Sequence, residues 1–359
     1  GKTESLRLIE KRFRDPGEAP RESEALTFFN TVFDRNDRRH IPYCYGHQRN
    51  ALLKDYVPGQ SLKQVLSNID SRIATNQSAL ESLVSSEGPT TERQELVREL
   101  ETLKQNKFEY AIALAVLLGK FHYASSNDMS IRNKGRFLGL DWPILNSKAI
   151  VSSFIDDLET LVRVDRDVSS EHLEKARAIF ERTGIPYDMN GMSTSPSPAL
   201  IIGDLHPRNI LVCVPKDERQ SFKKDVDSRF YLSKEILHYL RIIDLDRAQV
   251  GNPLIDLVDL IICPCFGIVP YQDRIDRVVE TYSASIASYN HTSPTGEDFM
   301  RMRSQVLSFS PVRALRSAAN VTGDQRRKYT ATASAMMRGS SKYNELYDFL
   351  AKTIPDFGG

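Results

Sequence analysis

Cysteine is scarce in this chain of 359 residues, which contains four, and tryptophan occurs only once. The cysteines, at positions 44, 213, 263 and 265, have a spacing that fits neither a disulfide framework nor a zinc site. Cys263 and Cys265 lie in the apolar run IICPCFGIV, where buried thiols are the expected state. We therefore expect a protein of a reducing, cytoplasmic compartment.

The chain also has almost no excess of positive or negative charge, because 48 basic and 47 acidic residues leave a net charge of +1. This balance argues against a protein dedicated to nucleic acid or to a membrane surface. No apolar run reaches the roughly 18 residues that a transmembrane helix needs, and no signal peptide is visible. The length is sufficient to bury a large core and to form two lobes.

Two short stretches carry the polar residues around which the sequence is organised. In ALIIGDLHPRNILV, residues 199–212, an apolar run stops before Asp204 and resumes after Asn209, five residues further on. In LRIIDLDRAQVGNPLI, residues 240–255, an apolar run leads straight into Asp244. Both patterns indicate polar side chains at the ends of short buried strands.

Phosphoryl transfer from a nucleotide requires side chains of these types. The acceptor hydroxyl must be aimed and the phosphate charge neutralised, while little covalent chemistry is left to the protein. We expect Asp204 to accept the hydroxyl proton, and Asn209 and Asp244 to supply the oxygen ligands that Mg²⁺ prefers. The structural alternative is a turn between two buried strands, with Asp244 as a helix N-cap.

The two stretches also carry a resemblance to a known family. GDLHPRNILV, residues 203–212, resembles the catalytic loop of the aminoglycoside phosphotransferase and choline kinase group, within the protein-kinase-like superfamily. Residues 242–256 resemble the metal-binding segment of that group. The resemblance implies an α+β, two-lobed kinase-like fold, with a small, partly β N-lobe over residues 1–57 and a large, mainly helical C-lobe over residues 58–359. It also implies Mg²⁺-dependent transfer of the terminal phosphate of ATP or GTP to a hydroxyl of a small molecule.

Further site residues follow from the resemblance alone. Residues 5–13 are expected to form a strand whose Lys11 contacts the nucleotide phosphates. Glu22, on the helix that follows, matches the acidic partner of that lysine, and Glu24 is the second choice. The structural alternative makes Lys11 an exposed strand residue and Glu22 a first-turn charge favoured by the helix dipole. Asp246, two residues after the metal-binding aspartate, is expected to help hold the metal or its loop.

The segment YVPGQSL resembles the hinge between the lobes of this family. It implies that adenine is held by backbone groups of Asp55, Tyr56 and Val57. His206, within the catalytic loop, is expected either to contact the terminal phosphate or to hold the loop through hydrogen bonds to the backbone; we favour the second role.

The sequence departs from the family pattern in three places. Four residues precede the first strand, where the family has a phosphate-covering hairpin, so either the N-lobe is truncated or phosphate coverage is reduced. The helical segment 63–107 and the segment 213–240 are longer than the family needs. These departures motivate two alternatives: a kinase-like modifier that attaches phosphate or a nucleotide to a protein partner, and a nucleotide-binding scaffold without turnover.

Residues 271–356 have a helical pattern, and helices of this region form much of the acceptor site in the resembling enzymes. Four arginines give the region a basic character that would suit an acidic acceptor, although exposed helix charges are the ordinary reading. They are Arg301, Arg303, Arg313 and Arg316.

Overall fold

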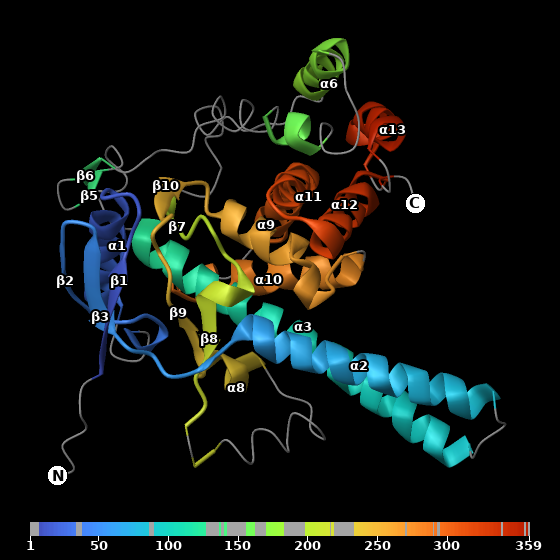
Figure 1. The fold of residues 1–359 in the computed structure, drawn as a ribbon, viewed down its shortest axis with the longest axis horizontal. Helices are drawn as coiled ribbons and strands as arrows, with labels where there is room; N and C mark the ends of the chain where they lie inside the picture. The colour runs from blue at the N-terminus through green and yellow to red at the C-terminus, as the bar shows by residue number, and fades with distance from the viewer. Residues whose placement is uncertain are drawn as a thin grey trace. The chain divides into compact units, whose positions relative to one another are not determined.

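A computed structural model describes residues 7–33, 38–85, 90–126, 136–137, 140–141, 156–161, 170–182, 198–215, 217–218, 233–269, 271–289, 291–292, 295–338, 340–354 and 357. The chain is mainly helical with small antiparallel sheets, as predicted (Figure 1). It divides into two compact units. The first comprises residues 1–125, 202–248 and 265–267, and the second comprises residues 126–201, 249–264 and 268–359.

The first unit begins with a three-stranded antiparallel sheet in the order β1-β3-β2, against which helix α1 packs. Burial alternates along the central strand, where Leu52 and Lys54 are buried and Leu53 is exposed. The elements are β1 (Leu8–Arg12), α1 (Glu18–Val32), the short helix η1 (Arg38–His40), β2 (Cys44–Gln48) and β3 (Ala51–Asp55). The sequence predicted β1 and β3 but not β2, because Gly46 and a register shift at Cys44 interrupt its pattern.

Aromatic packing joins α1 to the long helix α3 (Thr90–Ser126). The ring of Phe29 lies 4.4 Å from that of Phe121 and 5.4 Å from that of Phe33, centroid to centroid. All three side chains are buried. Large buried aromatic groups contribute strongly to core stability, so this cluster fixes α1, and with it Glu22, in the first unit.

The predicted helical insertion is present as α2 (Leu62–Ser85) and the first part of α3. Lys107 pairs with Asp70 at 2.5 Å and Arg72 pairs with Glu99 at 2.8 Å, which holds the two helices together. Residues 108–124 form the mostly buried second half of α3, which continues without a break from its first part. No proline lies within residues 90–126, so nothing in the sequence ends the helix.

The stretches 199–212 and 240–255 contribute β8 and β9 to a second three-stranded sheet, in the order β4-β8-β9. Gly59 precedes β4, and a Cβ atom there would lie 2.8 Å from Cys213 Sγ and 2.9 Å from the Val212 carbonyl oxygen. Only glycine therefore allows this close approach. The elements are β4 (Gln60–Ser61), the short helix η2 (Pro207–Asn209), β8 (Ile210–Val212), α8 (Ser233–Leu237) and β9 (Leu240–Ile242). Residue 216 and residues 219–232 of the predicted insertion 213–240 lie outside the described residues.

His40 gives the first unit a predicted pH dependence. It is fully buried, its Nδ1–H donates to the Leu240 carbonyl oxygen at 2.9 Å, and burial is the main cause that lowers its pKa from 6.5 to about 4. Below pH 6.5 the imidazole of the unfolded chain binds a proton, whereas that of the folded chain does so only below about pH 4. The free energy of unfolding therefore decreases as the pH falls through this window, by up to about 3 kcal/mol.

The measurement is denaturant unfolding of the parent and of His40→Gln between pH 7 and pH 4. Glutamine can still donate to the carbonyl but does not titrate, so the parent should lose stability relative to the variant as the pH falls. A difference that stays constant over this range would contradict the assignment of the shift to His40.

The second unit contains the two-stranded sheet β10-β7 and the predicted C-terminal helices. None of the described helices combines the length and apolar character that crossing a bilayer requires. The remaining elements are β5 (Arg136–Phe137), β6 (Leu140–Asp141), α6 (Ser170–Arg182), β7 (Ala199–Ile201), β10 (Gln249–Gly251), α9 (Leu254–Ile262), η3 (Pro264–Phe266), α10 (Gln272–Tyr289), α11 (Gly296–Ala319), α12 (Gly323–Arg338), η4 (Ser341–Tyr343) and α13 (Asn344–Thr353).

The arginines of this region are paired with carboxylates. Arg313 makes two contacts with Asp259, at 2.8 and 2.5 Å, and Arg303 pairs with Asp276 at 2.6 Å. Arg301 lies 3.3 Å from Asp298, and Arg316 lies 3.8 Å from a carboxylate oxygen of residue 157. The basic character read from the sequence is therefore largely neutralised by ion pairs within the unit.

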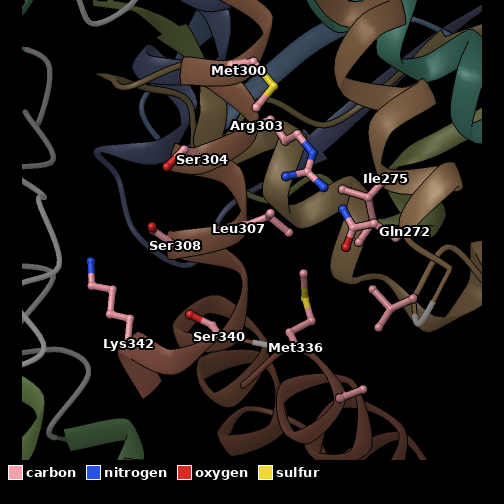
Figure 2. A pocket seen from close by; sticks show the side chains of 12 residues that line it. Gln272, Ile275, Met300, Arg303, Ser304, Leu307, Ser308, Met336, Ser340 and Lys342 are labelled. Atoms are coloured by element: carbon pink, nitrogen blue, oxygen red, sulfur yellow. The ribbon is translucent and has the colours of Figure 1, made fainter. Parts of the chain in front are cut away.

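A cavity of about 490 Å³ in the second unit is lined by residues from α10, α11 and α12 (Figure 2). Arg303 and Gln272 lie on its wall together with Ser304 and Met300. Arg303 is already paired with Asp276, so its own charge is opposed, and Lys342 is the other cationic side chain on the wall. The expectation that helices within residues 271–356 form the acceptor site stays a prediction.

Candidate active site

The catalytic-loop segment and the start of the metal-binding segment, residues 242–248, lie side by side in the first unit. Antiparallel pairing sets Ile210 of β8 opposite Ile242 of β9. At the strand ends, the N–H of Ile243 donates to the carbonyl oxygen of Asn209 at 3.0 Å. Asn209 and Asp244 are thereby fixed at neighbouring positions, on backbone that sheet hydrogen bonds hold in place.

The loop that carries Asp204 is shaped by its own hydrogen bonds. Gly203 has a φ of 77°, in the left-handed region that glycine adopts without strain, and Asp204 follows it with an exposed side chain. The side-chain Nδ2 of Asn209 donates to the Asp204 carbonyl oxygen at 3.2 Å. Since the amide nitrogen is used within the loop, Oδ1 is the atom that Asn209 can offer to a cation.

His206 holds this loop from within. Its Nδ1 accepts the N–H of Arg208 at 3.2 Å, and its carbonyl oxygen accepts the N–H of Asn209 at 2.8 Å. Burial is the main cause that lowers the pKa of His206, and the positive charges of Arg208 and Lys63 act in the same direction. A neutral imidazole that caps η2 fits the loop-holding role better than a cation aimed at phosphate.

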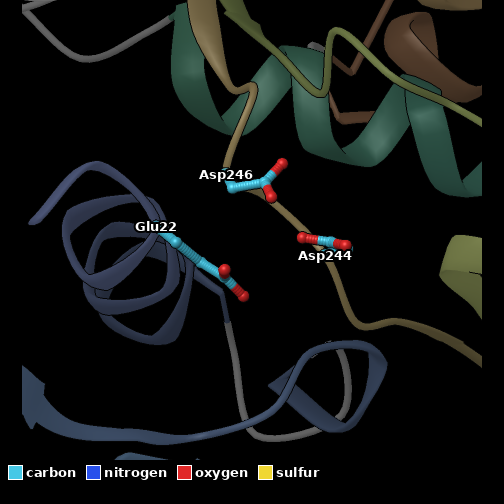
Figure 3. Close-up of side chains that lie close together, drawn as sticks. All are labelled: Glu22, Asp244 and Asp246. Atoms are coloured by element: carbon cyan, nitrogen blue, oxygen red, sulfur yellow. The ribbon is translucent and has the colours of Figure 1, made fainter. Parts of the chain in front are cut away.

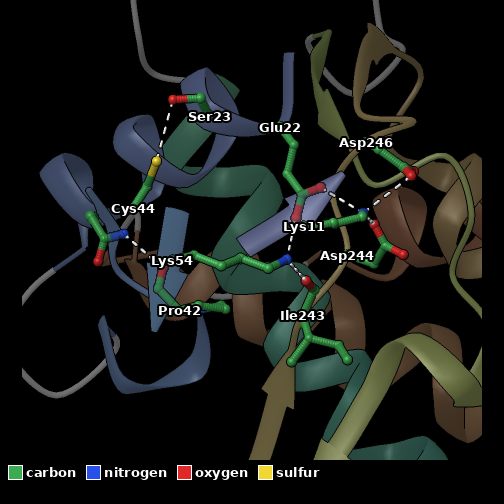
Figure 4. Close-up of polar contacts among 10 residues, drawn as sticks. Lys11, Glu22, Ser23, Pro42, Cys44, Lys54, Ile243, Asp244 and Asp246 are labelled. Atoms are coloured by element: carbon green, nitrogen blue, oxygen red, sulfur yellow. Dashed lines mark hydrogen bonds and ion pairs between the residues drawn. The ribbon is translucent and has the colours of Figure 1, made fainter. Parts of the chain in front are cut away.

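Lys11 lies at the centre of a cluster of carboxylates (Figure 4). Its Nζ is 2.7 Å from Glu22 Oε2, 2.5 Å from Asp244 Oδ1 and 3.3 Å from Asp246 Oδ2. Burial opposes the charge on Lys11, but Glu22 and Asp244 outweigh it and raise the pKa of the ammonium above its ordinary value. The strand, the helix and the metal-binding segment thus meet at this lysine.

The second choice for the acidic partner, Glu24, does not lie in this cluster. Its Oε2 is buried without a hydrogen-bond partner among the described residues, and burial raises the pKa of the carboxyl group to about 7. The structure therefore pairs Lys11 with Glu22.

The carboxylates around Lys11 form a donor set that fits a hard cation (Figure 3). One oxygen each from Glu22, Asp244 and Asp246 lies within 4.8 Å of the others. Oxygen donors of this kind suit Mg²⁺, which is bound through one or two carboxylates together with phosphate oxygens. Asp244 and Asp246 are about one quarter exposed, at 27 % and 24 %, whereas Glu22 is fully buried, so the two aspartates are the ligands open to a metal.

The hinge stretch offers fewer backbone groups than the sequence implied. The N–H of Asp55 donates to the Tyr43 carbonyl oxygen at 3.0 Å, and the N–H of Tyr56 donates to the Arg7 carbonyl oxygen at 2.9 Å. Within residues 55–57, the N–H of Val57 is the one with no acceptor in the described part of the chain. The predicted contact of this stretch with adenine through backbone N–H groups is thereby narrowed to Val57 and stays a prediction.

Sequence reasoning missed Lys54, which lies at the same site. Its Nζ contacts Glu22 Oε1 and donates to the Ile243 carbonyl oxygen at 2.6 Å. The signal was present in the strand ALLKD, where a lysine occupies the same face as the buried Leu52. A charged residue at an inward-facing strand position requires a buried partner.

Removing the Glu22 carboxylate is expected to destabilise the first unit. Glu22→Ala would leave the buried ammonium of Lys54 without its charge partner, and breaking a buried pair in this way costs about 3–5 kcal/mol. The measurement is the free energy of unfolding in denaturant, with Glu18→Ala on the same helix as the control. A loss below about 1 kcal/mol, as for an exposed pair, would show that Lys54 does not depend on Glu22.

Solved kinase structures are similar to this chain at low sequence identity. Choline kinase from Cryptosporidium parvum Iowa II is 11 % identical, with a TM-score of 0.52 over 95 % of this chain and 83 % of the other. The chain has the fold of choline kinase. This similarity confirms the predicted α+β kinase-like fold. At this level of identity it is evidence for the fold and not for the activity.

Two further structures are less similar. Ethanolamine kinase from Plasmodium vivax is 12 % identical, with a TM-score of 0.47 over 93 % of this chain and 76 % of the other. The ADP-bound aminoglycoside phosphotransferase APH(2'')-Ib is also 12 % identical, with a TM-score of 0.47 over 91 % and 86 %. No family model and no curated protein matches the sequence.

Proposed function

We propose that this chain is a Mg²⁺-dependent phosphotransferase that moves the terminal phosphate of ATP to a hydroxyl of a small-molecule acceptor. The observation that carries the proposal is the convergence of Lys11, Glu22 and Asp244, with contacts of 2.7 and 2.5 Å. Asp244 lies 233 residues from Lys11 in the sequence. Together with the loop of Asp204 and Asn209, the three residues provide each part that phosphoryl transfer needs.

Asp204 is the proposed base. Its side chain is exposed at the start of a loop that is held by His206 and Asn209. A carboxylate held in this way can accept the proton of an acceptor hydroxyl and aim its oxygen at the phosphate. The exposure of Asp204 suits this role, because the acceptor must reach it from solvent.

Asp244 and the Oδ1 atom of Asn209 are the proposed metal ligands, with Asp246 beside them. A bound Mg²⁺ would neutralise phosphate charge as the phosphate is transferred. Lys11 is the proposed phosphate contact, and its ammonium keeps its charge because Glu22 and Asp244 raise its pKa. Glu22 orients the lysine, and Val57 is the proposed hydrogen-bond donor to adenine.

The experiment that tests this function is transfer of labelled terminal phosphate from ATP in the presence of Mg²⁺. Acceptors would include amino alcohols such as choline and ethanolamine, aminoglycosides and other hydroxylated metabolites. Labelled phosphate on a small molecule supports the proposal. Phosphate or nucleotide mass added to a protein would support the protein-modifier alternative instead, and thermal stabilisation by ATP without transfer to any acceptor would support the scaffold alternative.

A further inference from the structure

Lys54 is the only lysine or arginine classed as buried in the part of the chain that the structure describes, with 3 % of its surface exposed. It lies on the central strand β3, opposite Ile9 of β1 and Cys44 of β2. A buried ammonium is costly unless it is paired and hydrogen-bonded. Its position therefore demands partners, and the structure supplies two.

The partners of Lys54 come from different elements of the first unit. Nζ contacts Glu22 Oε1 on α1 and donates to the Ile243 carbonyl oxygen at 2.6 Å (Figure 4). Ile243 immediately precedes Asp244, and its own N–H donates to the Asn209 carbonyl oxygen at 3.0 Å. Lys54 thus connects α1 to the backbone that joins the two proposed metal ligands.

Glu22 divides its carboxylate between two lysines. Oε1 accepts from Lys54, and Oε2 accepts from Lys11 at 2.7 Å. The side chain of Lys11 is 25 % exposed and that of Lys54 is 4 % exposed. Lys11 is therefore the lysine that can turn to a phosphate, whereas Lys54 stays with Glu22.

We infer that Lys54 is a positioning residue for nucleotide binding, because its ammonium fixes Glu22 and the backbone of Ile243 so that Lys11 and Asp244 keep their spacing. The inference rests on the proposed phosphotransferase function. Lys54 touches neither phosphate nor metal in this role and acts through Glu22 and the Ile243 carbonyl oxygen. Replacing a residue that supports metal-binding groups without touching the metal typically lowers metal affinity or activity about 10- to 100-fold.

The test is the affinity for a non-hydrolysable ATP analogue with Mg²⁺, measured by titration calorimetry. Lys54→Met is expected to weaken binding about tenfold or more. Because part of its effect passes through Glu22, the same change in a Glu22→Gln background is expected to weaken binding by a clearly smaller factor than in the parent. Lys107→Met, which removes another lysine from a 2.5 Å ion pair, is expected to leave the affinity unchanged.

The following results would contradict the inferred role of Lys54. Parent-like affinity in Lys54→Met overturns it and leaves the proposed function standing. Equal losses in the parent and Glu22→Gln backgrounds also overturn it, because a merely structural lysine acts additively. A parent protein that binds no analogue overturns the proposed function, and this inference with it. If Lys54→Met does not fold, Lys54→Gln, which keeps a hydrogen-bond donor, takes its place with the same expectations.

Discussion

Asp204→Asn is expected to lower the rate constant of phosphate transfer by about 10²- to 10⁴-fold, the range that a positioned general base contributes. Asparagine is close in size to aspartate but cannot accept the hydroxyl proton as a carboxylate does. The backbone carbonyl that accepts from Asn209 is unchanged, so the loop should keep its shape. The nucleotide affinity should therefore stay near that of the parent, and the loss should appear in kcat.

The control for this change is Asp273→Asn, which alters an exposed aspartate in the first turn of α10. It is expected to transfer phosphate as the parent does. If Asp204→Asn also transfers at the parent rate, Asp204 is not the base. If instead it loses nucleotide affinity, its role is in binding rather than in proton transfer.

Asp244→Asn is expected to weaken the metal-dependent binding of nucleotide on the order of 10²-fold. Changing a residue that only supports a metal ligand typically costs about 10- to 100-fold, and the loss of a ligand itself should cost at least as much. Two effects act together, because Mg²⁺ loses a charged oxygen ligand and Lys11 loses its 2.5 Å partner. The measurement is the affinity for Mn²⁺ and ATP by electron paramagnetic resonance, with Mn²⁺ standing in for Mg²⁺.

Asp70→Asn is a matched control, because Asp70 also pairs with a lysine at 2.5 Å, in the α2–α3 hairpin. It should bind Mn²⁺ and ATP as tightly as the parent. Binding by Asp244→Asn at the level of this control would contradict the proposed metal site. Tight Mn²⁺ binding in both proteins without dependence on ATP would place the metal elsewhere.

The positions of Asp204, Asn209 and Asp244 could be predicted because each lies within three residues of the end of a short apolar strand. A strand end is a local feature, and antiparallel pairing of the two strands brings these ends together. The pairing of Lys11 with Glu22 was implied by the family resemblance, and α1 brings the two together because Phe29 packs it against α3. The structure supports these placements, whereas the catalytic roles remain predictions.

The partners of Lys54 and the strand β2 could not be predicted, because both depend on contacts that the sequence pattern of the segment itself does not indicate. Lys54 could be placed on a strand, but its two partners lie 32 and 189 residues away in the sequence. The strand β2 lacks apolar alternation, because Gly46 and a bulge interrupt the pattern. It is a strand because it pairs with β3, and the sequence of β2 alone does not indicate this pairing.

The most direct test of the account is a crystal structure of the chain with a non-hydrolysable ATP analogue and Mg²⁺. A metal ion is expected to be bonded to an oxygen of Asp244 and to Oδ1 of Asn209, at about 2.0–2.1 Å. Lys11 is expected to contact a phosphate while Glu22 stays with Lys54, and Asp204 is expected to face the terminal phosphate. A triphosphate bound away from Asp244, or a metal ion that neither Asp244 nor Asn209 touches, would contradict the proposed site.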